Sequence, residues 1–342
     1  MALLEIEDLY VRFPTRDGVV KAVDGISFSV DRGQTLGVVG ESGSGKSVTA
    51  LTVMGLSRSP STEIEGHVRL DGVDLVPLES SELRDIRGKR VAMIFQDPMS
   101  SLHPLYKVGW QIEEAIRAHE NVSRKVARAR ALEALREVGI PSAAERLDAY
   151  PHELSGGMRQ RVMIAIALVL DPDVLIADEP TTALDVTVQA QILELIARLQ
   201  GEFGTTVILI THDLGIVADV ADDVAVMYGG RIVELASTAT LYDLPEMPYT
   251  LGLLSSVPRM DKELPERLDP IRGNPPSPIS LPKGCVFEPR CNYSDRTGGA
   301  SKSTRPELLE SRPDHFVRCH LPAEERQRIS KEVLRLLEGD AP

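Results

Sequence analysis

The chain has few aromatic residues, little positive charge and no long apolar run. Phenylalanine, tryptophan and tyrosine make up 4% of its 342 residues, which argues against a surface that binds nucleic acid by stacking bases. Lysine and arginine number 38 against 51 acidic residues, so the formal net charge is −13. Because phosphate backbones require concentrated positive charge, nucleic acid is not the expected main partner.

The sequence also has no segment of the about 18 apolar residues that predict a transmembrane helix. Its longest apolar run, residues 162–170, is only half as long. The first ten residues, MALLEIEDLY, contain acids and no apolar block typical of a secretory signal. These absences predict a cytoplasmic protein, which is held at a membrane only through another subunit.

Cysteine is scarce as well. The three cysteines, Cys285, Cys291 and Cys319, all lie in the last sixth of the chain. An odd number of cysteines does not form a complete disulfide framework. In a reducing cytoplasm a stable disulfide is not expected, whereas a metal centre suits thiolates.

A phosphate-binding loop is present near the N-terminus. Residues 40–47 read GESGSGKS and match the pattern G-x-x-x-x-G-K-[ST] at every fixed position. A short apolar strand over residues 34–39 and a buried helix over 47–56 give the loop the context that this motif requires. The glycines let the backbone wrap closely around a polyphosphate, and the N–H groups at the helix start face its oxygens. The expected ATP-binding residues are Gly40, Glu41, Ser42, Gly43, Ser44, Gly45, Lys46 and Ser47.

Two of these side chains have specific roles in such a loop. Lys46 is expected to reach the β- and γ-phosphates, and the Ser47 hydroxyl is placed to bind Mg²⁺. Phe13 ends a predicted strand over residues 3–13. Its ring either stacks on the adenine or packs as an ordinary core residue.

Buried apolar strands alternate with helical segments along the first two thirds of the chain. This order predicts an α/β fold, in which a small N-terminal antiparallel β layer precedes a mainly parallel sheet covered on both faces. A helical insertion occupies about residues 97–165, with a helical pattern over 108–138. After residue 237 prolines become frequent and periodicity is lost until a terminal helix over 323–337. We therefore expect an ATPase domain over 1–237 and a C-terminal extension over 238–342.

Polar residues follow three of the predicted buried strands, where ligands of parallel sheets collect. Asp178 fits the second magnesium-site acid of phosphate-loop enzymes, acting through water. Glu179 is positioned to be the general base that polarises the attacking water. His212 is a candidate for contacting the γ-phosphate, and Gln96 ends the strand over 90–95. Each residue alone is unremarkable in a loop, but their order after the phosphate loop predicts ATP hydrolysis.

Residues 154–161, LSGGMRQR, resemble the signature sequence of ATP-binding cassette (ABC) proteins. The phosphate loop, Gln96, the sequence Asp178-Glu179-Pro180, residues 183–185 and His212 match further motifs, and the resemblance covers residues 1 to about 235. It implies that Gln96 joins Ser47 and Asp178 around Mg²⁺ and shares in catalysis with Glu179 and His212. It also implies that two cassettes enclose two ATP molecules, each signature completing the partner's site. The residues implied at this trans site are Leu154, Ser155, Gly156, Gly157, Met158 and Asp185.

A finer resemblance is to the ATPase subunits of oligopeptide and dipeptide importers. It rests on residues 40–45, on Met158, and on the PYT and GCVFEPRC sequences of the extension. It implies a peripheral subunit at the cytoplasmic face of the inner membrane, paired with a second cassette that is either identical or a paralogue. Two transmembrane permease subunits and, indirectly, an extracytoplasmic solute-binding protein are the implied partners. Peptides are the expected cargo, with nickel, sugars or another small solute as alternatives.

In this family the extension can hold an iron–sulfur cluster on four cysteines, the usual ligand set of a [4Fe–4S] cluster. The present chain has three, and none near Gly298. A cluster would need a foreign ligand such as His320 or Asp295, and a zinc site would need His320 or His315. The third alternative is an extension ordered by docking on its own cassette or on the partner, with inert thiols.

Two other functions compete with transport. Soluble ABC ATPases that act on nucleic acid or ribosomes usually carry two cassettes or basic arms, whereas this chain has one cassette and an acidic balance. A regulatory cassette would bind ATP without hydrolysing it. The presence of Glu179 and His212 argues against that alternative.

Overall fold

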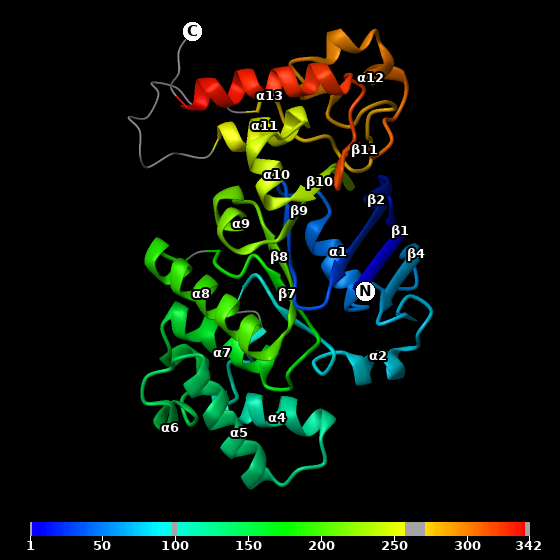
Figure 1. Ribbon diagram of the computed structural model, residues 1–342. Coiled ribbons are helices and arrows are strands. Elements are labelled where there is room, and N and C mark those ends of the chain that lie inside the picture. The colour runs from blue at the N-terminus through cyan, green and yellow to red at the C-terminus, as the bar shows by residue number, and fades with distance from the viewer. Residues whose placement is uncertain (1, 98–100, 183, 257–270, 339–342) are drawn as a thin grey trace.

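The computed structural model describes residues 2–97, 101–182, 184–256 and 271–338. Two sheets form its centre (Figure 1). The smaller sheet is antiparallel, has the strand order β2-β1-β4-β5 and comes from the N-terminal part of the chain. Its strands are β1 (Ala2–Thr15), β2 (Gly18–Asp31), β4 (Glu63–Leu70) and β5 (Val73–Asp74).

The larger sheet has the strand order β11-β12-β10-β9-β3-β8-β7-β6. The strands from β9 to β6 pair in parallel, and β10, β12 and β11 add an antiparallel edge. This arrangement confirms the predicted α/β class with a mainly parallel core sheet and an antiparallel N-terminal layer. The strands are β3 (Thr35–Val39), β6 (Val91–Ile94), β7 (Val174–Asp178), β8 (Thr206–Thr211), β9 (Asp223–Tyr228), β10 (Arg231–Ser237), β11 (Leu309–Arg312) and β12 (His315–Val317).

The central strands are apolar throughout because both of their faces are covered. Every residue of β3, β7 and β8 is buried. Successive side chains of a strand point to opposite faces, so Ile176 joins the core beneath the N-terminal sheet while Leu175 joins the core beneath the helices. A strand of this kind needs a continuous apolar run rather than an alternating one.

Helices cover the larger sheet and form the insertion at the bottom of Figure 1. The predicted helical stretch over 108–138 is two helices, because Ser123 caps the second one and accepts a hydrogen bond from the Val126 N–H group. The insertion contains α4 (Val108–His119), α5 (Arg124–Glu137), α6 (Ala143–Arg146) and α7 (Gly156–Leu168). The other cassette helices are α1 (Lys46–Val53), α2 (Ser80–Ile86), α8 (Val186–Phe203) and α9 (Leu214–Val220).

The C-terminal extension packs at the opposite end of the molecule from the insertion (Figure 1). Its strand β12 pairs with β10 of the cassette, with Glu234 opposite Val317. The extension thus continues the cassette's own sheet, as the alternative of docking on its own cassette predicts. Its helices are α10 (Thr238–Asp243), α11 (Pro248–Ser255), α12 (Ala300–Ser303) and α13 (Ala323–Glu338).

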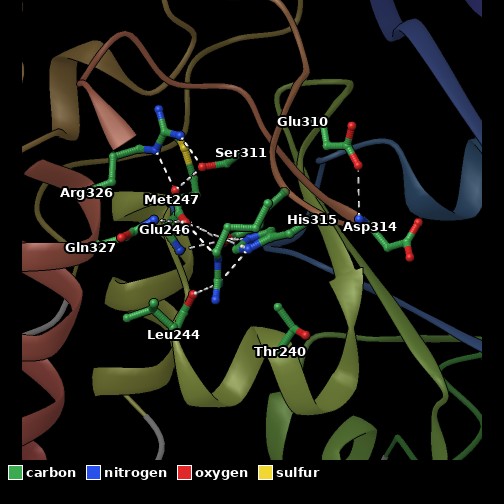
Figure 2. Close-up of polar contacts among 12 residues, drawn as sticks. Thr240, Leu244, Glu246, Met247, Glu310, Ser311, Asp314, His315, Arg326 and Gln327 are labelled. Atoms are coloured by element: carbon green, nitrogen blue, oxygen red, sulfur yellow. Dashed lines mark hydrogen bonds and ion pairs between the residues drawn. The ribbon is translucent and has the colours of Figure 1, made fainter. Parts of the chain in front are cut away.

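A buried network of charged groups also connects the C-terminal extension to the cassette (Figure 2). Glu246 is fully buried and accepts hydrogen bonds from Ser311 at 2.6 Å, Arg312 at 3.1 Å, Arg326 at 2.9 Å and Gln327 at 3.1 Å. Burial alone would raise the pKa of Glu246, but its hydrogen bonds to neighbouring side chains outweigh burial and hold that pKa below its usual value.

Glu234 of β10 is the cassette's contribution to the network. Its carboxylate accepts the backbone N–H groups of Glu246 and Met247, at 2.6 and 3.2 Å. It also lies 2.7 Å from Nε2 of His315, whose Nδ1 lies 2.7 Å from Arg312. Since His315 and Glu234 are both fully buried, neither side chain can exchange these partners for water. The extension is therefore anchored by ionic contacts in addition to strand pairing.

Candidate functional site

The phosphate-binding loop connects β3 to α1 and is shaped by two tight backbone contacts. A Cβ on Gly40 would come within 2.2 Å of the Met227 carbonyl oxygen, and one on Gly45 within 2.4 Å of the Ala22 oxygen. Gly45 also has a φ of 105°, which disfavours any residue with a side chain. Only glycine at these two positions lets both ends of the loop lie against the strands.

The two functional side chains of the loop point into it. Lys46 is buried, and its Nζ donates to the carbonyl oxygens of Gly40 at 2.6 Å and Glu41 at 3.1 Å. Burial lowers its pKa, while Glu179 and Asp178 oppose that shift. Ser47 Oγ donates to Asp178 Oδ1 at 3.1 Å. The hydroxyl and the carboxylate predicted around Mg²⁺ are therefore neighbours, although they are 131 positions apart in the sequence.

Glu179 is the centre of a second group of contacts at the end of β7. Its carboxylate accepts hydrogen bonds from Gln96 Nε2 and Thr182 Oγ1, both at 2.9 Å, and lies 3.4 Å from His212 Nδ1. Its own backbone is left-handed, with a φ of 46°, and its N–H group donates to Ile210 O at 2.8 Å. Such a conformation costs about 1–3 kcal/mol in a residue other than glycine. The fold thus holds this carboxylate in one orientation.

Asp178 and His212 differ in environment. Burial raises the pKa of Asp178, and the neighbouring Glu179 adds to that rise, whereas the hydrogen bond from Ser47 opposes it. His212 is exposed, with 64% of its side chain accessible. An exposed imidazole beside a fixed carboxylate is free to meet a ligand that arrives from solvent.

The predicted signature begins α7. Ser155 caps this helix by accepting the Met158 N–H group, and Gly156 and Gly157 form its first turn. A Cβ on Gly157 would lie 2.9 Å from Val188 Cγ1, so the signature packs against the start of α8. Asp185 caps α8 by accepting the Val188 N–H group at 3.0 Å. The two implied trans-site segments therefore lie side by side on one chain.

The remaining predicted residues have more ordinary surroundings. Leu154 is buried in the core beneath the helices, and Met158 is half-buried against it. Phe13 is half-buried, lies opposite Val20 in the N-terminal sheet and packs against the core beneath that sheet. Ala183 lies outside the described residues.

Three further contacts at this site were not among those predicted from the sequence. Thr182 orients Glu179, as described above, and two residues of the extension contact the phosphate-binding loop. Tyr249 accepts the Glu41 N–H group at 2.9 Å, and Arg290 donates to both oxygens of the Glu41 carboxylate. Thr182 could have been found from its place after Asp178-Glu179-Pro180. No local signal connects Arg290 with a loop 249 positions earlier.

The three cysteines are free thiols in apolar surroundings. Burial raises the pKa of Cys291 to about 11 and that of Cys319 to about 12. Among the residues that the structure describes, no three metal-ligating side chains are grouped to hold an ion. Two of the proposed fourth ligands are also engaged, because His315 contacts Glu234 and His320 lies 2.7 Å from Thr304 O. The donor set does not fit a [4Fe–4S] cluster, and the expectation of one has no support here.

Among the helices that the structure describes, none combines the length and the apolar character that spanning a membrane requires.

Comparison with known proteins connects these features. Residues 23–182 match the ABC transporter family, and residues 233–297 match the C-terminal region of oligopeptide/dipeptide transporters. The chain is 48% identical to the oligopeptide transport ATP-binding protein OppD of Haemophilus influenzae, over 94% of this chain and 98% of the relative. It is 51% identical to the dipeptide transport ATP-binding protein DppD of Bacillus subtilis, over 99% and 98%.

Solved structures agree with this assignment. An ATP-binding cassette solved as a dimer in a post-hydrolysis state, bound to ADP and phosphate, superimposes with a TM-score of 0.62 at 26% identity. The match covers 69% of this chain and 98% of the cassette. The phosphate-binding loop, the fixed Glu179 and the signature helix therefore lie in a cassette fold. The chain belongs to the ABC transporter ATPases, in the family of oligopeptide and dipeptide transport ATP-binding proteins.

Proposed function

We propose that this chain hydrolyses ATP to power the import of oligopeptides or dipeptides. The observation that carries the proposal is the combination of an ABC transporter match with an extension matched to peptide transporters, in one chain that aligns with such relatives along nearly its whole length. The division of the chain at residue 237 is part of this proposal. Peptide cargo is preferred to nickel or sugars because the relatives carry peptide names.

The contacts of the site support a role for each residue. The loop over residues 40–47 binds the phosphates, and Lys46 neutralises their charge. Ser47, Asp178 and Gln96 are the proposed ligands of Mg²⁺, and the adjacent oxygens of Ser47 and Asp178 fit a cation that prefers oxygen donors. Bound Mg²⁺ would neutralise charge that develops on the transferred phosphoryl group.

Hydrolysis itself is assigned to Glu179. Gln96 and Thr182 donate to one oxygen of its carboxylate, which leaves the other oxygen near His212 to accept a proton from the attacking water. In this position Glu179 acts as a general base. His212 orients the water and contacts the γ-phosphate, as its exposed position allows. Phe13 is kept as the proposed adenine contact.

A second cassette is required for a complete site. The N–H groups at the start of α7 are an anion cradle, because helix N-termini attract negative charge. We assign this cradle, with Asp185 of the neighbouring α8, to the ATP bound by the partner cassette. The dimeric state of the similar cassette supports this assembly.

The insertion provides a surface for the permease subunits at the cytoplasmic face of the membrane. Leu105 is 77% exposed, and the exposed rings of Tyr106 and Trp110 stack at 4.1 Å. Gln111 holds the loop that carries Leu105 and Tyr106 by hydrogen bonds to the backbone of His103 and Tyr106, and Trp110 lies in α4. This apolar patch lies shortly after Gln96 in the sequence, and Gln96 donates a hydrogen bond to Glu179. We therefore expect docking at the patch to affect the position of the Glu179 carboxylate.

Reconstitution tests the proposed cargo. The chain would be co-expressed with candidate permease subunits, purified as a complex and placed in vesicles with a candidate solute-binding protein. Di- and oligopeptides should stimulate ATP hydrolysis and accumulate across the membrane. Nickel and sugars are the comparison solutes. Stimulation by one of them in place of peptides would move the function to that cargo while leaving the ATPase assignment intact.

A further inference from the structure

The C-terminal extension contacts the phosphate-binding loop at Glu41. Arg290 donates through Nη1 to Oε2 of this carboxylate at 2.5 Å and through Nη2 to Oε1 at 3.0 Å. The Tyr249 hydroxyl accepts the Glu41 N–H group at 2.9 Å. Both the side chain and the backbone of Glu41 are therefore held by residues of the extension.

Arg290 is itself fixed on every side. Only 5% of its side chain is exposed. Its Nε donates to Arg272 O at 2.8 Å, and its Nη1 donates to the Tyr228 hydroxyl at 3.2 Å. The rings of Tyr228, Tyr249 and Phe287 pack together, with centroids 4.6 to 5.3 Å apart. A guanidinium held in this way meets a carboxylate with both of its donors in fixed geometry.

Glu41 is also the point where the loop needs support. Gly40 and Gly45 are wedged against the cassette, but Ser42 and Gly43 are exposed, and a Cβ on Gly43 would meet nothing within 4 Å. Between these parts, the Glu41 carbonyl accepts the Ser44 N–H group at 3.2 Å and Lys46 Nζ at 3.1 Å. The position of Glu41 thus sets the position of two groups that face the phosphates.

We propose that Arg290, together with Tyr249, is a positioning residue that presets the phosphate-binding loop for ATP. The extension holds Glu41 so that the loop is already in its binding shape before nucleotide arrives. When only a fraction of the molecules has the binding-competent conformation, the apparent affinity for the ligand is reduced by that fraction. We call the contacts of Arg290 and Tyr249 with Glu41 the latch. If losing the latch leaves the loop in its binding shape about one tenth of the time, the Kd for ATP rises about tenfold.

Three variants of the full-length chain test the latch. Arg290→Met removes both donors, Glu41→Gln keeps the shape but loses the charge, and Tyr249→Phe removes the acceptor for the backbone N–H group. The Kd for Mg·ATP would be measured by titration calorimetry, beside the unfolding midpoint without nucleotide. We expect an increase of about tenfold for Arg290→Met and about threefold for each of the other two. In the assembled complex kcat of Arg290→Met at saturating ATP should stay within about twofold while KM rises, because Arg290 contacts the loop at Glu41 and not Glu179.

A matched control separates the latch from the attachment of the extension. Arg312→Met also removes a guanidinium from the extension, but its partners are Glu246, Leu244 and His315 rather than the loop. It should lower the unfolding midpoint and leave the Kd for ATP unchanged. The double variant of Arg290→Met and Glu41→Gln should bind no more weakly than Arg290→Met alone, since the two residues act as a pair.

Several results would overturn the proposal. Unchanged Kd values for Arg290→Met and Glu41→Gln would make the contact structural only. An equal loss in Arg312→Met would assign the effect to the extension as a whole. A double variant whose loss is the product of the single losses would show that the residues act separately. If Arg290→Met fails to fold, Glu41→Gln and Tyr249→Phe decide, because neither removes the buried guanidinium.

Discussion

Glu246 is expected to determine how firmly the C-terminal extension is attached. Replacing it with alanine removes the shared acceptor of Ser311, Arg312, Arg326 and Gln327. Breaking a buried ion pair from one side costs about 3–5 kcal/mol, because the other charge stays buried without a partner. Arg326 is the partner that matters most, since its side chain is 10% exposed against 31% for Arg312. Glu246→Gln, which keeps an acceptor, should cost about 1–3 kcal/mol.

Hydrogen exchange is the appropriate assay, because a protein with two parts need not unfold in one step. A loss of about 3 kcal/mol in local stability corresponds to about 100-fold faster exchange of the affected amides. We expect this acceleration at Phe316 and Val317 of β12, which pair with β10. Amides of the central strand β3 should exchange as in the wild type.

Glu310→Ala is the matched control for this experiment. Glu310 belongs to the same hairpin, but it is exposed, and its carboxylate accepts a hydrogen bond from the Asp314 N–H group at 3.2 Å (Figure 2). Its removal should change stability by no more than about 0.5 kcal/mol. Unchanged exchange of β12 in Glu246→Ala, or equal acceleration in the two variants, would refute the assignment of Glu246 as the anchor.

The same carboxylate predicts a pH dependence. Because the folded pKa of Glu246 lies below its ordinary value of 4.5, its contribution is fully present above that pH and is lost as the pH falls through the folded pKa. The difference in β12 protection between the wild type and Glu246→Ala should therefore shrink below pH 4.5. A difference that grows on acidification would contradict the sign of this shift.

Three further predictions concern the site, the membrane partner and the thiols. Glu179→Gln should leave ATP binding intact, reduce hydrolysis by at least about 100-fold and trap the closed cassette dimer, whereas near-normal turnover in the complex would exclude its role as base. The segment over residues 96–103, of which 98–100 lie outside the described residues, should gain protection from hydrogen exchange when the permease subunits bind; protection confined to the extension would place the docking surface there instead. Anaerobic purification followed by iron, sulfide and zinc analysis should find substoichiometric metal and three titratable thiols. Stoichiometric iron and sulfide would instead support a bound iron–sulfur cluster.

The elements around the nucleotide were predictable because each is encoded by adjacent residues. A continuous apolar run predicts a strand buried on both faces, which β7 and β8 are. The glycines at Gly40 and Gly45 allow the close backbone approaches that the loop motif predicts. The gathering of polar residues at the strand ends follows from the parallel sheet, and it brings Asp178 next to Ser47. The break between α4 and α5 was harder to predict. The residue composition around Ser123 remains typical of a helix, although the backbone leaves the helical conformation there.

The attachment of the extension was not predictable in the same way. Strand β12 has three residues, too few for a periodic signal, and its pairing with β10 joins segments about 80 positions apart. The few apolar residues of this region suggested that something besides burial orders it, and a metal centre and docking on a cassette were the alternatives. The structure uses long-range polar contacts instead, with Glu234, Glu246 and His315 fully buried.

Buried charges of this kind explain why the extension and the loop can be coupled. An apolar contact tolerates small shifts, but a buried carboxylate has no substitute partner, so it holds its neighbours in one arrangement. Glu246 fixes the extension on β10, and Arg290 then presents a fixed guanidinium to Glu41. The rings of Tyr228, Tyr249 and Phe287 pack against one another, and the Tyr228 hydroxyl accepts a hydrogen bond from Arg290. The loop that binds ATP is therefore supported from the far end of the chain, and its affinity depends on residues that no nucleotide-binding motif contains.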